Sequence, residues 1–390
     1  MRPKRTRTDY DVVIVGARCA GAAAAMLMAR QGIRVLAIDR GRYGSDTLST
    51  HALMRGAVLQ LHRWGVLPDV QRAGTPPVRR TTFFYDGKAV TVPIKARDGV
   101  DGLYAPRRAV LDSILVDSAL ESGAIVRHDT RLVQLLRSAT GRVCGVIVDH
   151  DDTGEQRITA DLVIGADGMR STVAKLVGAQ TYRTGRHASG TVYGHWLGLE
   201  ADGYEWHYRL GAGAGLIPSN DGASCVFVTV PAGRFAAEFR GSVPGGFQRV
   251  LSDVAPDLAS AVERAERVGG LQGFAGQTGF YRQSWGPGWA LVGDAGYFKD
   301  PFTAHGITDA LRDAELLASA AARGTDAFAE YQRSRDDLSG ELFELTDDIA
   351  SFAWDLPQLR VLHEQLAAAM SAEVKALSGF THRAPELEHA

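Results

Sequence analysis

Three short apolar runs, each followed by a glycine, stand out in the hydrophobic pattern of the 390-residue chain. They cover residues 12–15, 162–164 and 289–292. A run that is apolar at consecutive positions is typical of a strand buried on both faces, as in a parallel sheet. An alanine-rich helix over residues 22–31 and a second strand over 33–38 follow the first run. The pattern therefore predicts an α/β protein that opens with a strand–helix–strand unit.

The middle of the chain has a different pattern, rich in aromatic and β-branched residues. Asp86-Gly87 lies between the first two of these runs and is a strong hairpin signal. We expect a mixed antiparallel sheet from these runs. Its strands are predicted at residues 81–85, 89–92, 190–197, 204–210 and 223–230.

Helical periodicity marks residues 247–267, with an Asp/Pro break, and residues 326–377, with a break at Pro357. A further helix begins near Gly306. One apolar stripe runs along it and indicates a buried face; its members are Ile307, Leu311, Ala314 and Ala318. The tail packs against the first domain or mediates dimerisation, and the sequence leaves both open.

Composition is that of a soluble globular protein, with 45% hydrophobic and 23% charged residues. Lys and Arg number 43 against 45 Asp and Glu, and the net charge of −2 gives no sign of binding to nucleic acid or to an anionic membrane. Cys19, Cys144 and Cys225 are few and widely spaced, so neither a disulfide framework nor a zinc site is indicated, and we expect no bound metal.

The N-terminus carries a basic segment with Arg2, Lys4, Arg5 and Arg7. Acidic residues interrupt the stretch that follows, which argues against a signal peptide. No apolar run approaches the roughly 18 residues of a transmembrane segment. We therefore expect a solvated leader and a cytoplasmic protein.

The first glycine turn has the spacing of a dinucleotide-binding site. Gly16 permits a tight turn after the strand, and Gly21 lets the following helix pack closely on the sheet. A pyrophosphate would then lie at the helix N-terminus, against the turn that contains Ala17. Asp39, followed by Arg40, ends the second strand at the distance needed for an acid on the ribose hydroxyls.

Two further motifs follow the other apolar runs. The second is Asp161-Leu-Val-Ile-Gly-Ala-Asp167-Gly168, and the third is Trp289-Ala-Leu-Val-Gly293-Asp294-Ala with Pro301 and Gly306 beyond it. In this order the motifs resemble those of the single-Rossmann flavoprotein superfamily. That superfamily includes class A flavin monooxygenases, geranylgeranyl-type reductases and flavin-dependent halogenases. The resemblance covers roughly residues 9–325 and implies a bound FAD.

The resemblance assigns roles around FAD. Asp294 would bind the ribityl chain, and Arg108 would open a helix and reach the phosphates. Asp167-Gly168 would touch both FAD and a nicotinamide cofactor, NADH or NADPH. The expected FAD-binding set is completed by Gly293, Pro301, Ala304, His305, Gly306 and Ile307.

The chain departs from the family pattern at three places. Arg18 stands where the second glycine of the fingerprint is expected, and its side chain should point away from the pyrophosphate. The arginine that often follows Ser171 is absent, since Ala174 and Lys175 occur there. Ala304 replaces a glycine of the third motif, which we regard as a mild change.

The motifs and strands together predict three regions. A discontinuous Rossmann-type FAD-binding domain covers residues 9–80, 104–178 and 284–325. A mixed β-sheet that caps the flavin and holds the substrate covers 81–103 and 179–283. A C-terminal helical region covers 326–390.

The helix that begins near Gly306 carries a physical argument of its own. Its N-terminus would point at the flavin pyrimidine ring, where reduced flavin is anionic. A helix N-terminus stabilises an anion by about 0.3–2 kcal/mol. The alternative is an ordinary helix end capped by solvent.

Two histidines are candidate catalytic residues. His51 follows Ser49-Thr50, where the chain of the family passes close to the flavin, and it is a candidate acid/base or a helix cap. His305 lies beside the flavin-directed helix and either positions a ligand or caps that helix. The candidate substrate pocket comprises Thr50, Tyr193, Trp196, Trp206 and Tyr281, although such aromatic residues are more often core.

The leading hypothesis for function is an FAD-dependent monooxygenase. It would use NADH or NADPH and O₂ to hydroxylate or epoxidise a small aromatic or unsaturated substrate through a flavin C4a-hydroperoxide. The alternatives are a reductase of isoprenoid-like double bonds and a non-redox FAD-binding cyclase. A halogenase is disfavoured because none of the six tryptophans forms a Trp-x-Trp pair. The sequence leaves monomer and homodimer open.

Overall fold

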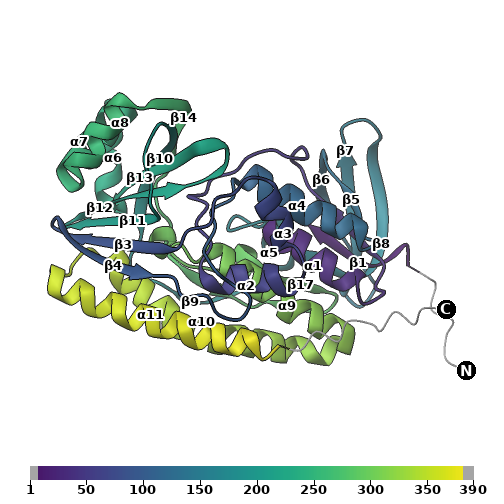
Figure 1. The fold of residues 1–390 in the computed structure, drawn as a ribbon. Coiled ribbons are helices and arrows are strands. Elements are labelled where there is room, and N and C mark those ends of the chain that lie inside the picture. The colour runs from purple at the N-terminus through teal and green to yellow at the C-terminus, as the bar shows by residue number, and fades with distance from the viewer. Residues whose placement is uncertain (1–7, 381–390) are drawn as a thin grey trace, which may run out of the picture.

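The computed structural model describes residues 8–380 and is built around an eight-stranded sheet (Figure 1). Its main path runs in the order β16-β17-β8-β1-β2-β5. The bounds of these strands are β1 (Tyr10–Val15), β2 (Val35–Ile38), β5 (Ile125–Arg127), β8 (Gly154–Gly165), β16 (Trp285–Gly286) and β17 (Trp289–Leu291). Two more strands, β6 (Thr130–Arg137) and β7 (Val143–His150), join through β8.

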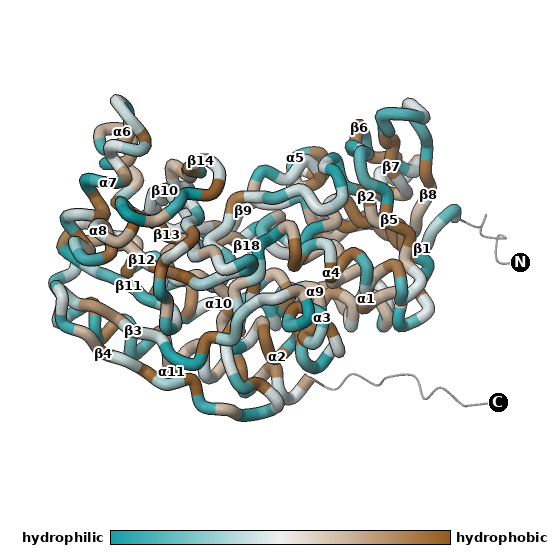
Figure 2. Tube along the Cα trace, turned by 45° about the horizontal axis from the view of Figure 1, so that its top comes forward, coloured by the Kyte–Doolittle hydropathy of each residue, from teal (hydrophilic) through white to brown (hydrophobic). Residues whose placement is uncertain are grey.

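The three apolar runs form neighbouring parallel strands in this sheet. The strand β8 pairs in parallel with β1 on one side and with β17 on the other. The carboxyl ends of parallel neighbours meet at one edge, so the three glycine motifs are brought together there. The apolar residues of the three runs are buried, and Figure 2 shows the apolar colour of β1 and of the neighbouring β2 and β5.

Helices cover this sheet, and the first of them is unusually close to it. The four alanines of residues 22–25 are fully buried, because α1 packs between the sheet and two further helices, α4 and α9. The small side chains permit this close approach. The helices of this part are α1 (Cys19–Ala29), α2 (Arg55–Arg63), α3 (Leu67–Arg72), α4 (Arg108–Glu121), α5 (Thr172–Val177) and α9 (Gly306–Arg323).

The middle of the chain forms a seven-stranded sheet with the order β14-β10-β13-β12-β11-β3-β4. Three helices cover one face, and the other face turns toward the Rossmann part (Figure 1). The bounds are β3 (Arg80–Tyr85), β4 (Lys88–Pro93), β10 (Ser189–Leu197), β11 (Tyr204–Arg209), β12 (Ala212–Pro218), β13 (Ala223–Pro231), β14 (Glu266–Phe274), α6 (Ala232–Phe239), α7 (Val243–Val254) and α8 (Pro256–Arg264). A small sheet contains β9 (Thr181–Thr184), β15 (Phe280–Arg282) and β18 (Tyr297–Phe298).

The five strands predicted for the seven-stranded sheet are confirmed, and its other two strands were missed. The strand β12 reads Ala-Gly-Ala-Gly-Leu-Ile-Pro, and its glycines hide the strand pattern. The strand β14 begins at Glu266, inside the stretch predicted as helical up to residue 267. The predicted break in that stretch is confirmed, because Pro256 starts α8 directly after Ala255.

The C-terminal region forms two long helices, α10 (Phe328–Ala350) and α11 (Leu356–Ser378), which run beneath both sheets (Figure 1). The predicted break is confirmed. Pro357 lies in the first turn of α11, and Asp355 caps that helix in a capping box with Gln358. The helix α11 packs against α2, and Tyr85 of β3 contacts His363 through a hydrogen bond of 2.8 Å.

The predicted α/β class, with a Rossmann-type part, a mixed sheet and C-terminal helices, is confirmed. The proposed domain boundaries stay a prediction, although β3 and β4 lie in the same sheet as β10–β14, as proposed. The basic leader and residues 381–390 lie outside the described range. Within residues 8–380, no helix is both long and apolar enough to cross a bilayer.

We expect Gly21→Ala to lower the free energy of unfolding by at least about 2 kcal/mol. A Cβ at Gly21 would overlap the carbonyl oxygen of Gly16, so the helix would have to move off the turn. Gly233→Ala in α6 is the matched control, because no atom lies near its Cβ position. Urea unfolding with FAD in fixed excess measures both variants. Equal stabilities of the two variants would contradict the packing argument.

Candidate functional site

The first motif forms a cradle of backbone groups. Gly16 has a φ of 103°, and a Cβ there would collide with the backbone of Ala166, at the end of β8. The helix α1 begins at Cys19, and its first turn is closed by the amide of Ala22 donating to the carbonyl of Arg18 (2.8 Å). The amides of residues 18–21 therefore precede the helical ladder, and they can bind a pyrophosphate.

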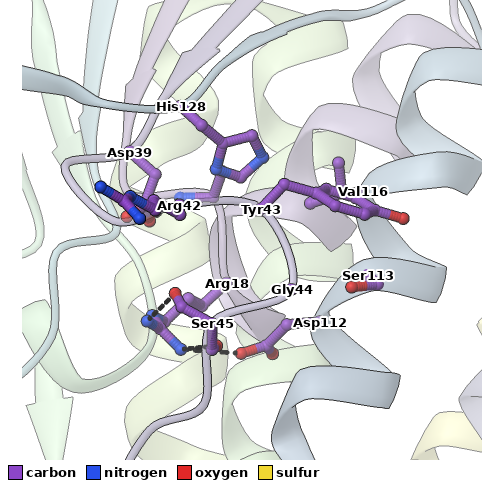
Figure 3. Close-up of a pocket in the computed structure, with 11 residues that line it drawn as sticks. Arg18, Asp39, Arg42, Tyr43, Gly44, Ser45, Asp112, Ser113, Val116 and His128 are labelled. Carbon is purple, nitrogen blue, oxygen red and sulfur yellow. Dashed lines mark hydrogen bonds and ion pairs between the residues drawn. The ribbon is translucent and has the colours of Figure 1, made fainter. Parts of the chain in front are cut away.

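Asp39 lies at the end of β2 and holds this turn together. Its carboxylate accepts hydrogen bonds from the amides of Ala17 (2.8 Å) and Gly41 (2.7 Å). It also lines a pocket with Tyr43 and His128, whose rings meet edge to face (Figure 3). The ribose contact of Asp39 stays a prediction, since a carboxylate has further acceptor sites.

The pocket includes residues that the sequence reading missed. Arg40 is exposed, and Arg42 lines the pocket instead. The Nε2 atom of His128 is buried without a hydrogen-bond partner in the described part of the chain. A buried imidazole nitrogen of this kind is a natural contact for a ligand with polar groups, such as adenosine. The edge-to-face contact of the Tyr43 and His128 rings, seen in the structure, identifies these two residues as part of the pocket.

Arg108 opens α4, as expected, and it is bound to Asp112 one turn later. Its Nε and Nη2 atoms lie 3.1–3.2 Å from the Asp112 carboxylate. Cys19 donates its thiol to the same carboxylate (3.0 Å), and burial raises the pKa of this thiol. Arg18 also reaches Asp112 (3.3 Å), and it lines the pocket (Figure 3). The expectation that the Arg18 side chain points away from the pyrophosphate stays a prediction.

The acidic residue of the second motif, Asp167, stabilises the start of a helix. The Asp167 carboxylate accepts hydrogen bonds from the Ser171 hydroxyl and from the amides of Thr172 and Val173, at the start of α5. Both oxygens of Asp167 therefore already accept hydrogen bonds from this helix. The contacts of Asp167 to FAD and nicotinamide stay a prediction, since the carboxylate has a further acceptor site. Gly168, at a φ of 78°, has open space around its Cβ position.

The third motif packs on the first. The short helix η2 (Gly293–Ala295) places Gly293 against Ala20 of α1, where a Cβ would meet the alanine side chain at 2.9 Å. Desolvation and the Asp309 carboxylate raise the pKa of Asp294 to about 7, although Arg108 lowers it. An acid with this environment, near Arg108, fits the expected ribityl contact.

The turn before α9 carries backbone strain. After η3 (Pro301–Thr303), Ala304 has a φ of 51°, in the left-handed region that favours glycine. The replacement of glycine is therefore less mild than expected. The helix α9 begins at Gly306, as predicted, and has no side-chain cap. The amides of Gly306 and Ile307 stay available for an anion.

His305 makes no side-chain hydrogen bond to the start of α9. Its Nε2 atom binds Glu373 of α11 (2.6 Å), and both side chains are buried. This bond gives the imidazole a structural partner, and the catalytic and FAD-binding roles of His305 stay predictions. Arg312 binds Glu373 and Asp309 (each 2.7 Å), and Lys299 lies 2.8 Å from Asp309. The two cations therefore lie against the acids of a buried cluster, His305, Asp309 and Glu373, whose polar side-chain atoms, one from each residue, all lie within 4.8 Å of one another.

His51 meets a histidine that the sequence reading did not single out. The Nε2 atoms of His51 and His195 lie 3.0 Å apart, and both residues are buried. Burial lowers the pKa of His51 to about 3, with a contribution from His195, and burial lowers that of His195 to about 4. His51 does not cap α2, whose N-cap is Met54. The pair is neutral at pH 7 and joins the loop after β2 to strand β10 of the seven-stranded sheet.

The aromatic candidates divide between two faces of the seven-stranded sheet. The hydroxyl of Tyr193 accepts a hydrogen bond from the Ser49 amide (3.0 Å), and Tyr193 and Trp206 share the core with the Rossmann part. The prediction that Trp196 lines the substrate pocket is corrected, because its ring stacks on Phe247 of α7, on the opposite face of the sheet.

The prediction that Tyr281 lines the substrate pocket is also corrected. Its hydroxyl forms a hydrogen bond with Ser339 of α10, and its ring packs with Tyr297 and Phe343, outside the seven-stranded sheet. Thr50 is half-buried in the loop, and its role stays a prediction. The period of two along β10 was the signal for His195, two residues after Tyr193.

We expect Glu373→Gln to destabilise the protein by about 3–5 kcal/mol, because Arg312 would lose a buried carboxylate. Glu364→Gln, on the exposed side of α11, should change stability by less than about 0.5 kcal/mol. Urea unfolding at constant FAD concentration tests both variants. A loss below 1 kcal/mol in Glu373→Gln, on the order of a surface change, would contradict a structural role for the cluster.

The histidine pair predicts acid sensitivity. An unfolded histidine binds a proton below about pH 6.5, whereas the folded pair stays neutral down to about pH 4. As the pH decreases below about 6.5, the free energy of unfolding therefore decreases by about 1.4 kcal/mol per pH unit for each histidine. Between pH 7 and pH 5, His195→Gln should lose about 2 kcal/mol less than the parent protein.

The control for this effect is His62→Gln, which changes an exposed histidine. Denaturant unfolding across pH 5–7 (about the range where histidine charge changes) measures all three proteins. An identical pH slope for His195→Gln and the parent would show that the pair is not neutral in the folded protein.

The site as a whole fits FAD. The nucleotide and ribityl parts of FAD each have a matching group of residues. The glycine cradle of α1 and the arginines at Asp112 would hold the diphosphate, and the pocket beside Asp39 would hold the adenosine. Asp294 would bind the ribityl chain.

Comparison with known proteins supports this fit. The 1H-pyrrole-2-carbonyl-(peptidyl-carrier protein) brominase of Pseudoalteromonas luteoviolacea is 22% identical over 90% of this chain and 86% of its own. The menaquinone reductase of Mycolicibacterium smegmatis is 28% identical over 80% and 76%. The structure of the flavin-dependent brominase Bmp2, in a triple mutant, matches with a TM-score of 0.79 at 20% identity, covering 95% of this chain and 97% of that one.

A family model described as FAD binding domain matches residues 9–327. That range contains all three glycine motifs and the whole seven-stranded sheet. The chain therefore belongs to the FAD-binding-domain family and is an FAD-dependent oxidoreductase.

Proposed function

We propose that the protein is an FAD-dependent monooxygenase that hydroxylates or epoxidises a small aromatic or unsaturated substrate, with NADH or NADPH as electron donor. The observation that carries the proposal is the neutral His51–His195 pair. It lies where the loop after the first FAD motif meets the aromatic face of the seven-stranded sheet. A largely apolar wall with few polar groups suits such a substrate.

The bound flavin would supply the redox chemistry. In the overall reaction the nicotinamide donates a hydride, and a proton and O₂ are consumed. One oxygen atom enters the substrate, and the other leaves as water. Two electrons from the nicotinamide and two from the substrate balance the four-electron reduction of O₂.

The residues of the chain would bind and orient the reactants. The uncapped amides at the start of α9 favour negative charge on the flavin pyrimidine ring. Tyr193 and Trp206 would contact the substrate, together with Thr50. The low pKa values of the histidines argue against His51 as a general base at neutral pH. The pair would instead orient a substrate hydroxyl or carbonyl through hydrogen bonds.

Two alternatives come from relatives. A menaquinone reductase and a digeranylgeranylglycerophospholipid reductase of Methanopyrus kandleri, the latter 26% identical over 95% of this chain and 90% of its own, favour a reductase of isoprenoid-like double bonds. The brominase favours halogenation, which the tryptophan pattern argued against. A non-redox cyclase has no support among the relatives named here.

The test is the reaction of the reduced protein with oxygen. The FAD-loaded protein is reduced chemically without air, so that the natural donor does not matter, and is mixed with O₂ in a stopped-flow spectrometer. We expect a transient absorbance that belongs neither to reduced nor to oxidised flavin. Direct return to the oxidised spectrum would overturn the monooxygenase and favour the reductase.

A second arm adds bromide. Faster decay of the transient with bromide, in proportion to its concentration, would indicate halide oxidation and would overturn the monooxygenase in favour of a halogenase. A decay that is independent of bromide supports the proposal. Reduction of the flavin by NADH and NADPH in parallel identifies the donor.

A further inference from the structure

Arg18 is the feature of the site that the FAD fingerprint does not explain. The fingerprint has a glycine at this position because the backbone there comes closest to the pyrophosphate. In this chain the position carries a guanidinium that is about one-third exposed. Its side chain lines the pocket together with Ser45 and Asp112 (Figure 3).

The Arg18 side chain ties two other elements together. Nη1 donates to the carbonyl of Ser45 (3.2 Å) and to Asp112 of α4 (3.3 Å), and Nη2 donates to the Ser45 hydroxyl (3.2 Å). A guanidinium has five N–H groups, and these bonds use three of them. Two donors are left for a ligand in the cleft.

The charges around Asp112 are unequal. Arg18 and Arg108 share this one carboxylate, and Cys19 beside it is a neutral thiol. One positive charge is therefore uncompensated within the cluster, beside the N-terminus of α1. The Nη1 atom of Arg108 makes no hydrogen bond within residues 8–380, so it too can reach an anion. A dianionic diphosphate would complete this arrangement.

Ser45 belongs to a loop that spans the length of the site. The loop leaves β2 at Asp39, and its Tyr43 lines the pocket beside Asp39. Farther along the loop, Asp46 pairs with Arg107 (2.7 Å). The loop then reaches the seven-stranded sheet through Ser49 and His51. Arg18 therefore fixes the middle of a segment that would lie over the diphosphate.

We propose that Arg18 is a second diphosphate-binding arginine, which latches the Ser45 loop over FAD and slows its release. In a glycine fingerprint the backbone alone contacts the phosphates at this position. Here the side chain adds a charged fork that binds phosphate and loop together. The inference concerns FAD retention and does not depend on which reaction the flavin performs.

The test measures FAD release from the full-length protein by the recovery of flavin fluorescence after dilution. We expect Arg18→Ala to release FAD at least 10-fold faster than the parent. Arg131→Ala is the matched control, because Arg131 also pairs with one carboxylate, Asp149, but lies on the β6–β7 hairpin. Its release rate should equal that of the parent.

The salt dependence of FAD release distinguishes a contact between Arg18 and phosphate from a purely structural role of Arg18. The ratio of the two release rates should shrink as the salt concentration rises, because salt screens a partly exposed charge. Release by Arg18→Ala within 2-fold of the parent would overturn the proposal, and so would a ratio that salt does not change. If Arg18→Ala does not fold, Arg18→Lys decides: it keeps the charge but not the fork, so release at the parent rate would overturn the latch.

Discussion

The contact between the Gly16 turn and the first turn of α1 is the constraint on which the rest of the site depends. No side chain fits between Gly21 and the carbonyl of Gly16, and the end of β8 closes on Gly16 from the other side. The helix therefore starts directly at the edge of the sheet. That placement aims its free amides into the cleft and lets Gly293 of the third motif pack against Ala20.

A second constraint is the buried charge cluster behind the cleft. Arg312, Asp309 and Lys299 on the α9 side meet Glu373 of α11, all in the interior. Burying these groups is tolerable only because each charge has a partner at hydrogen-bond distance. The cluster fixes the C-terminal helix to the helix that faces the expected flavin ring, so the tail of the chain is part of the site's foundation.

The loop after β2 connects the first glycine motif to the seven-stranded sheet. Its contacts run from Asp39 through Ser45 to His51, which reaches His195 on β10. His51 has a φ of 71°, unusual for a residue with a side chain. The surrounding structure must over-determine such a conformation, and strain of this kind is common where a loop positions a functional group.

The sequence by itself determined the Rossmann start, the order of the three motifs and the place of each at a strand end. Those features depend on local rules: apolar runs for buried strands, and glycine where a side chain cannot fit. The hairpin at Asp86-Gly87 and the helix beginning at Gly306 follow from equally local signals. The strand β12 did not, because its side chains are mostly small and its pairing is set by β11 and β13.

Only the tertiary structure decided how the polar side chains are used. His305 binds Glu373, and Arg18 binds Asp112, and in both cases the partner comes from a distant part of the chain. The same holds for His51, whose partner His195 lies 144 positions away. A side chain of this kind takes its role from the groups that surround it in space, and the sequence does not order those groups.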